Sequence, residues 1–190
     1  MNRTSVIGML AAATAVLTLA GCTSSERPAA GAPVVVTSAP AADQHNSVDV
    51  TFAQGMVPHH QQAVDMATLV STRAAGAQVK QLASRIEQAQ GPEIEQLQGF
   101  LKSWGAPASG MGHDMAGMQP DQQLTELRQA TGTAFDRLFL QLMVEHHTGA
   151  VQMAQTELAA GQSAEAKALA KAIVTAQQAE ITEMNGLLAG

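Results

Sequence analysis

Apolar residues recur at intervals of three and four along most of the chain beyond residue 47, which is the spacing of amphipathic helices. No stretch of strictly alternating apolar and polar residues indicates a strand, and good helix formers such as Ala, Gln, Leu and Glu dominate. The sequence therefore predicts an all-α domain, with Ser47 as the expected N-cap of its first helix. The predicted long helices cover about residues 48–73, 77–104, 133–160 and 163–188, and a short helix covers 121–130.

Pro58 and Pro92 fall inside two of these helical patterns. A proline removes one backbone hydrogen bond, so each is expected to kink its helix or to mark a boundary. Gly161 is expected to close the helix that precedes it.

The helical pattern occurs twice. Residues 52–67 and 139–154 are offset by 87 positions and are identical at ten of sixteen of them. The identity continues into the following helix, so the duplicated unit is an αα-hairpin, and two such hairpins predict a four-helix bundle of the ferritin-like kind. The matching pairs in the second helices are Lys80/Lys167, Leu82/Leu169, Ala83/Ala170, Ile86/Ile173, Ala89/Ala176, Gln90/Gln177, Glu93/Glu180 and Ile94/Ile181.

Both copies of the motif direct histidines and methionines toward the bundle interior. At 100° per residue they share one helix face with small alanines, whereas Pro58, Gln61, Gln62 and Asp65 point away. The inward residues are Met56, His59, His60 and Met66 in the first copy and Met143, His146, His147 and Met153 in the second.

A methionine stripe or a single inward histidine is usually ordinary core. Four inward histidines are harder to accommodate, because each needs a hydrogen-bond partner or costs about 1–3 kcal/mol of desolvation. A metal ion would satisfy several at once. Imidazole with thioether is typical of copper, particularly Cu(I), whereas zinc rarely takes methionine.

The Gly-rich connection over residues 105–120 adds a second cluster of soft ligands. The expectation is a weak, flexible Cu(I) site, and the alternative is a linker whose methionines fill gaps in the core. The candidate ligands there are Met111, His113, Met115 and Met118.

The N-terminal segment reads as an export signal. Arg3 precedes an apolar run that is short for a membrane span, and Leu19-Ala20-Gly21-Cys22 follows as a lipobox. The expected organisation is a signal peptide over 1–21, a lipidated Cys22 with a flexible Ala-, Pro-, Ser- and Thr-rich linker over 22–46, and the helical domain over 47–190. That domain divides into repeat one (47–104), the Met-rich connection (105–120) and repeat two (121–190). The alternative is an ordinary secretory signal that contains a cysteine.

These features indicate a protein anchored by lipid to the extracytoplasmic face of the cell membrane. Cys22 is the only cysteine, which excludes a disulfide within the chain. Without the signal the chain carries nine basic and sixteen acidic residues and no basic cluster, so nucleic acid is excluded as a partner.

The doubled motif M-V-P-H-H-x-x-A-V-x-M-A and M-V-E-H-H-x-x-A-V-x-M-A resembles the signature of the family called domain of unknown function 305. The resemblance covers about residues 45–188 and implies a ferritin-like fold and export. Some family members are reported to bind copper and to contribute to copper tolerance. Residue by residue, the resemblance implicates the eight inward histidines and methionines. Pro58 in the first motif is replaced by Glu145 in the second, so the two copies need not be equivalent.

Three functions remain in competition. The first is a copper-binding lipoprotein that sequesters or buffers the metal, and the second is a structural or interaction module of the cell envelope with no metal role. The third, a di-iron carboxylate enzyme, is disfavoured because the chain has no Glu-x-x-His motif and its repeated motif shares no carboxylate. The expectation is a protein that is not an enzyme.

Overall fold

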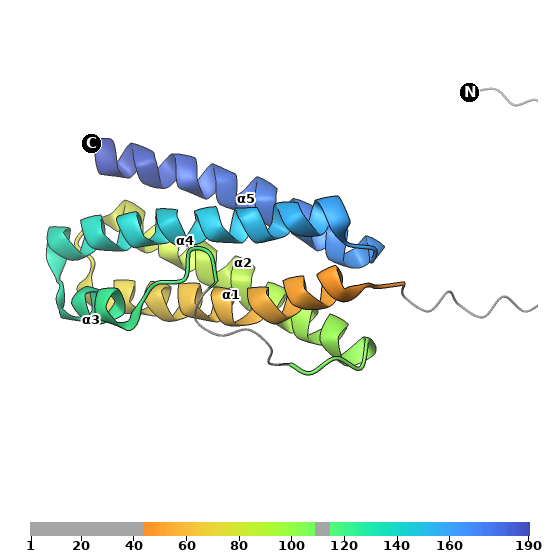
Figure 1. Ribbon diagram of the computed structural model, residues 1–190. Helices are drawn as coiled ribbons and strands as arrows, with labels where there is room; N and C mark the ends of the chain where they lie inside the picture. The colour runs from red at the N-terminus through yellow and green to blue at the C-terminus, as the bar shows by residue number, and fades with distance from the viewer. Residues whose placement is uncertain (1–43, 109–114) are drawn as a thin grey trace, which may run out of the picture. The chain divides into compact units, whose positions relative to one another are not determined.

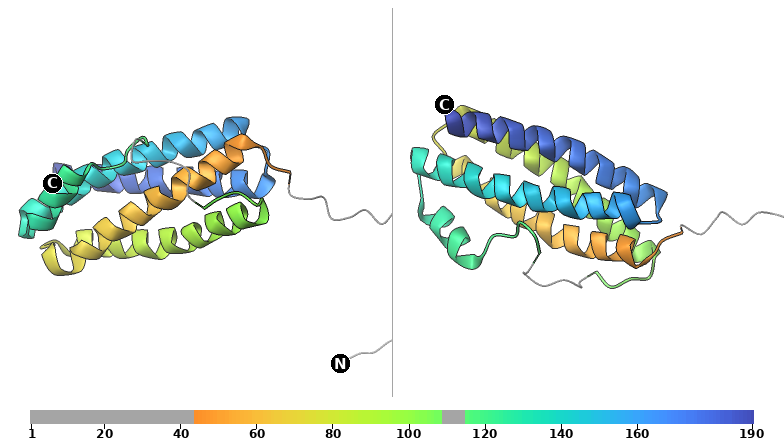
Figure 2. Two further views of the ribbon diagram at one scale, coloured as in Figure 1. Left: turned by 60° about the horizontal axis from the view of Figure 1, so that its bottom comes forward. Right: turned by 45° about the horizontal axis from the view of Figure 1, so that its top comes forward.

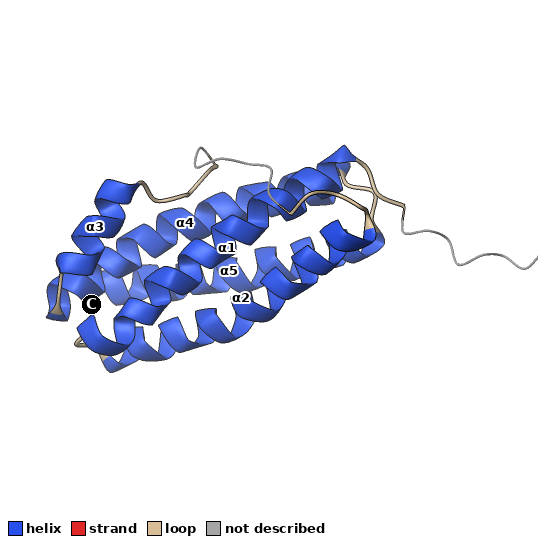
Figure 3. Cartoon of the chain, turned by 90° about the horizontal axis from the view of Figure 1, so that it is seen from below, coloured by secondary structure: helices blue, strands red, loops and turns tan. Residues whose placement is uncertain are grey.

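A computed structural model describes residues 44–108 and 115–190, and Figure 1 shows their course. In this part of the chain all regular structure is helical (Figure 3), apart from one isolated bridge between Ala74 and Gly132. None of the helices described is long and apolar enough to span a membrane. The helices are α1 (Ser47–Arg73), α2 (Ala77–Ser103), α3 (Asp121–Gln129), α4 (Gly132–Ala160) and α5 (Ala164–Ala189).

The helices pair as the duplication predicts. α1 packs most extensively on α2, and α4 on α5, so each repeat forms an antiparallel hairpin. The hairpins meet mainly through α1 and α4, which Figure 2 shows side by side, whereas α2 and α5 touch little. The prediction of a four-helix bundle is confirmed, and α3 is an addition that packs against α4.

One detail of the helices differs from the sequence prediction. The N-cap of α1 is Asn46, not Ser47, because the Asn46 side chain accepts hydrogen bonds from the backbone N–H groups of Val48 and Asp49. Asp49 in turn accepts from the backbone N–H of Asn46, which completes a capping box. Pro58 and Pro92 mark no boundary, since α1 and α2 continue through them. Pro92 is exposed and Pro58 half-buried.

Each hairpin turn is held by an aspartate from the other hairpin. Asp49 in α1 accepts hydrogen bonds from the backbone N–H groups of Gln162 and Ser163, in the turn between α4 and α5. Asp136 in α4 accepts from the N–H groups of Ala75 and Gly76, in the turn between α1 and α2. In each turn one of the two donors is the N-cap residue of the following helix, Ser163 for α5 and Gly76 for α2, and the bonds join the hairpins at both ends.

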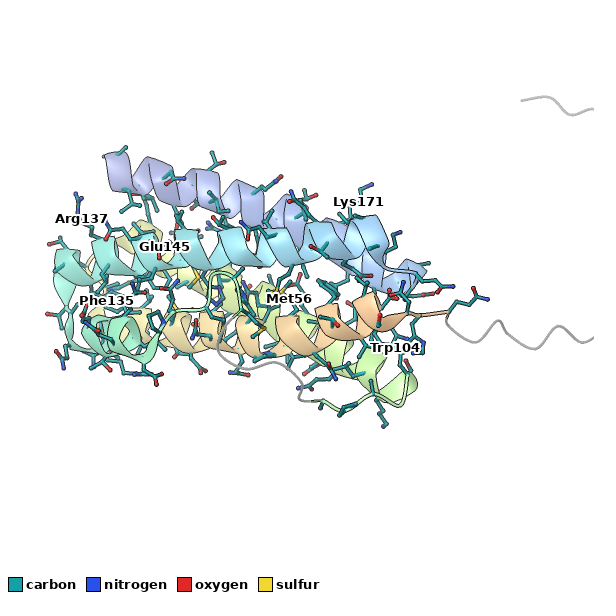
Figure 4. All side chains as sticks on the ribbon, viewed as in Figure 1. Met56, Trp104, Phe135, Arg137, Glu145 and Lys171 are labelled. Atoms are coloured by element: carbon teal, nitrogen blue, oxygen red, sulfur yellow. The ribbon has the colours of Figure 1, made fainter. Side chains whose placement is uncertain are left out.

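The core consists of two apolar clusters rather than one. The first includes Met66, Phe135 and Phe139, and the second includes Phe52 and Met56. Figure 4 shows Phe135 toward one end of the bundle, Trp104 at the other and Met56 between them. Along both α1 and α4 the paired histidines lie between residues of the two clusters. The bundle is therefore interrupted near its middle by a layer of polar side chains.

Candidate metal centre

The polar residues between the two apolar clusters come from all four long helices, and we call them the central polar layer. The four histidines and the two glutamines are buried, and the glutamates lie partly at the edge. The inward direction predicted for the histidines is therefore observed. The layer consists of His59, His60, Gln90, Glu93, His146, His147, Gln177 and Glu180.

His60 and His147, which we call the outer histidines of the layer, each form a hydrogen bond with a glutamate of their own hairpin. The Nε2 atom of His60 lies 2.7 Å from Glu93 Oε2, and the Nε2 atom of His147 lies 2.7 Å from Glu180 Oε2. The side chains of His60 and His147 are fully buried, whereas those of Glu93 and Glu180 keep 19% and 16% of their surface exposed. The two hairpins thus build the same His–Glu pair.

His59 and His146, which we call the inner histidines, contact each other across the interface between α1 and α4. The ring centroids of His59 and His146 are 3.8 Å apart. Burial, and then the charge of His60, lower the pKa of His59 to about 3, although its hydrogen bond to Ala116 opposes the shift. Burial, followed by the neighbouring histidines, holds the pKa of His146 well below its ordinary value. Both rings are therefore neutral at physiological pH and free to ligate a metal.

Residues 115–119, at the end of the connection, pack on His59 and His146, and we call them the docked segment. The carbonyl of Ala116 lies 3.1 Å from His59 Nε2 and accepts its hydrogen bond. Gly117 has φ +81°, and a Cβ there would lie 2.7 Å from the carbonyl oxygen of His146. A Cβ on Gly149 would collide with the carbonyl of Ala116. Glycines on both sides of the contact therefore allow backbone to approach backbone at the histidines.

The docked segment is also held by a buried glutamine. The side chain of Gln119 donates to the carbonyl of Leu142, and its backbone exchanges two hydrogen bonds with the side chain of Gln62. Gln62 was expected to point away from the bundle, but it is half-buried because this segment covers it.

Met115 and Met153 both approach α1 at Gly55. Glycine at position 55 leaves room for them, since a Cβ there would lie 3.2 Å from Met115 Sδ and 3.6 Å from Met153 Sδ. Together with Phe52 and Glu157 they line a cavity of about 290 Å³. Met115, a candidate ligand of the connection, thus lines the same cavity as Met153 of the repeated motif.

The remaining candidate methionines fall into two groups. Met66 and Met118 line a groove of about 250 Å³ between α1 and α3. Met56 and Met143 are fully buried in the two apolar clusters, where they act as packing residues in this structure. Met111 and His113 lie outside the described residues, as do the signal segment and Cys22.

Sequence reasoning missed the glutamates. It treated the repeated motif as lacking a shared carboxylate, yet Glu93 and Glu180 occupy equivalent places in the second helix of each repeat. The signal was their identity at the offset of 87. Gln90 and Gln177 gave the same signal, and both are buried one turn before those glutamates.

The donor set, imidazoles with thioethers, suits a soft metal ion. Within the described residues no three His, Cys, Asp or Glu side chains are grouped closely enough to hold a metal ion. Thioethers or a shift of the rings would have to complete the coordination. Among the histidines of the central polar layer, five buried ring nitrogens have no hydrogen-bond partner, and these are Nδ1 of His59, His60 and His147 and both nitrogens of His146.

Fold and site together define a helical bundle whose buried histidine layer is flanked by thioethers. Residues 49–188 match the family model described as domain of unknown function (DUF305), and the chain belongs to that family. A search of curated proteins gave no match.

Solved structures of this family share the fold. A protein from Streptomyces coelicolor, described as a secreted DUF305 protein, is 35% identical with a TM-score of 0.72 over 75% of this chain and 93% of that one. A DUF305 fragment from Deinococcus radiodurans is 33% identical, with a TM-score of 0.70 over 76% and 97% of the two chains. CopM in its Cu(I)-bound form is 31% identical, with a TM-score of 0.64 over 73% and 94%.

Proposed function

We propose that this protein is an extracytoplasmic copper-binding lipoprotein that sequesters or buffers the metal. The observation that carries the proposal is the set of five unpartnered ring nitrogens buried in the central polar layer. Leaving such atoms unpaired costs stability, and their retention in both repeats is explained if a ligand satisfies them.

The residues that would hold copper are the four histidines of the layer, together with Met115 and Met153, which line the cavity that reaches Ala116. Imidazole and thioether together favour Cu(I), which is stable with few ligands. The bound copper would be cargo, and the chain's own part is to offer soft donors in a site shielded from water. The likeness to CopM, which has been crystallised in Cu(I)-, Cu(II)- and silver-bound forms, supports this choice of metal.

The alternatives are a structural module without metal and an iron site. The iron alternative gains from Glu93 and Glu180, which bring carboxylates next to imidazoles, since iron accepts both ligand types. It is opposed by the lack of any group of three such ligands in the described part of the chain.

Metal analysis tests the proposal. The mature domain, produced without a metal-affinity tag and without chelator, should retain copper rather than iron, and should bind Cu(I) in anaerobic titration against a chromophoric competitor. His60→Ala and His147→Ala decide how the ligands are shared. If both motifs feed one site, either variant abolishes tight binding, and if each hairpin has its own site, each variant loses about half the stoichiometry. Copper binding that is unchanged in both variants would overturn the assignment of the histidines.

The membrane anchor is tested separately. Cys22→Ser should release the protein from the membrane fraction, because lipid chains on that residue would contribute about 0.8 kcal/mol per buried CH₂ group. A mutant that still partitions with membranes would refute lipidation at Cys22.

A further inference from the structure

In both His–Glu pairs of the central polar layer the carboxylate contacts the same ring atom of the histidine, Nε2. Glu93 and Glu180 each approach the Nε2 atom of a histidine at 2.7 Å, and each belongs to the same hairpin as its histidine. Both carboxylates are partly exposed, at 19% and 16%, so water also solvates them. An ionised carboxylate only accepts hydrogen bonds, so Nε2 must be the nitrogen that carries the proton.

The other nitrogen of each ring points to no partner. Nδ1 of His60 and Nδ1 of His147 are buried and have no hydrogen-bond partner. A proton on Nδ1 would be a buried donor without an acceptor, whereas a ring protonated only at Nε2 keeps a free electron pair there. That electron pair is what a metal ion requires.

His59 follows the same rule with a different acceptor. Its Nε2 atom lies 3.1 Å from the carbonyl of Ala116, which can only accept, and its Nδ1 atom is buried without a partner. In this layer three of the four rings are therefore held by Nε2 and leave Nδ1 open. His146, which has no partner at either nitrogen, is the exception.

We propose that Glu93 and Glu180 are positioning residues that hold His60 and His147 by their Nε2–H groups, so that Nδ1 of each ring is the atom that binds metal. The proposal rests on the proposed function of metal binding. A carboxylate on the far side of a ligating imidazole fixes the tautomer and the ring plane and raises the basicity of the ligating nitrogen. Neither glutamate touches the metal in this arrangement.

The first test needs no metal. Two-bond ¹H–¹⁵N spectra of the metal-free domain, labelled at histidine, distinguish the Nε2–H tautomer from the Nδ1–H tautomer and from imidazolium. His60 and His147 should both show the Nε2–H pattern at neutral pH. An Nδ1–H or imidazolium pattern at both rings would overturn the proposal, without any variant being made.

Variants then separate the two hairpins. Glu93→Gln should change the tautomer pattern of His60 alone, and Glu180→Gln that of His147 alone, because an amide can donate as well as accept and no longer dictates the tautomer. Each should weaken Cu(I) binding about 10- to 100-fold while helix content stays the same. Glu95→Gln in α2 and Glu183→Gln in α5 are matched controls, since Glu95 is exposed and Glu183 pairs with Arg85 instead of a histidine.

The outcomes distinguish this proposal from the proposed function. A wild-type domain that binds no Cu(I) would overturn the copper assignment, and the metal-free spectra would still report on the rings. A domain that binds Cu(I) with the same affinity and the same tautomers in both glutamate variants as in the controls would overturn the positioning roles alone.

Discussion

The two ends of the bundle are closed by equivalent aspartates that lie in different surroundings. Asp49 and Asp136 are 87 residues apart, and each caps the turn of the opposite hairpin through two successive backbone N–H groups. Asp49 is fully buried and faces Glu157, whereas Asp136 is half-buried and the position equivalent to Glu157 is Val70. The hydrogen bonds are therefore the same at both ends, but only the end at Asp49 has a second carboxyl group, that of Glu157, beside the aspartate.

The charges at the buried end follow from this pairing. Burial raises the pKa of Asp49, but the backbone N–H groups of Asn46, Gln162 and Ser163 outweigh it and hold the pKa below its ordinary value. Burial, followed by the negative charge of the neighbouring Asp49, raises the pKa of Glu157 to about 8, although the charge of Lys167 opposes the shift. At neutral pH Glu157 therefore keeps its proton while Asp49 is ionised.

The central polar layer shows the same contrast. The His–Glu pairs repeat with the same 2.7 Å distance in both hairpins. The inner histidines differ, because the docked segment gives His59 the carbonyl of Ala116 and gives no partner to either nitrogen of His146. A segment that exists once in the chain can satisfy only one of two equivalent rings.

Removing the two aspartates should give unequal losses. Asp49→Ala removes a fully buried acceptor from the N–H groups of Asn46, Gln162 and Ser163, and should cost about 3 kcal/mol of unfolding free energy. Asp136→Ala strands N–H groups that water can partly reach, and should cost about 1 kcal/mol. Urea unfolding followed by circular dichroism measures both, and equal losses would show that burial does not separate the two ends.

A methyl group at Gly149 should displace the docked segment. The Cβ would collide with the carbonyl of Ala116, so Gly149→Ala should cost about 2 kcal/mol and remove the hydrogen bond that distinguishes His59 from His146. The matched control is Gly99→Ala in α2, where a Cβ meets nothing within 4 Å, and it should stabilise the helix by about 1 kcal/mol. Thermal melts of the two variants that shift in the same direction would contradict the docking.

The pH dependence of stability should identify the titratable end. The unfolded chain releases the Glu157 proton near its ordinary pKa of 4.5, whereas the folded protein keeps it up to about pH 8. The contribution of this group is therefore complete below pH 4.5 and is lost as the pH rises through about 8. Between pH 6 and pH 8 the wild type should lose on the order of 2 kcal/mol relative to Glu157→Gln. Parallel stability curves for the two proteins would mean that Glu157 is ionised throughout.

Replacing the inner histidines by leucine should sharpen the contrast between them. His146→Leu removes two unpartnered ring nitrogens and should leave the metal-free domain unchanged or about 1 kcal/mol more stable. His59→Leu also strands the carbonyl of Ala116, and should be less stable than His146→Leu by about 1 kcal/mol. Both should weaken Cu(I) binding, and the stability difference is measured on metal-free protein. The opposite order of stabilities would show that the docked segment does not depend on His59.

The sequence by itself determined the helices, the duplicated hairpin and the inward direction of the four histidines. Those features can be predicted from local periodicity, because residues three and four apart lie on the same face of a helix. The N-cap was placed one residue late, because Asn46 and Ser47 are both good caps and only the hydrogen bonds of Val48 and Asp49 decide between them.

Only the tertiary structure decided what the histidines contact. Glu93 and Glu180 were visible as an identical pair in the repeat, but a charged residue on a helix normally faces water, and their reach to His60 and His147 depends on how α2 and α5 pack. Gly149 leaves room for Ala116 to reach His59, and Gly55 leaves room for the sulfur atoms of Met115 and Met153. Both glycines lie in helices that are distant in sequence from the docked segment. Contacts between distant segments depend on the shape of both surfaces, and no local pattern in one segment records the shape of the other.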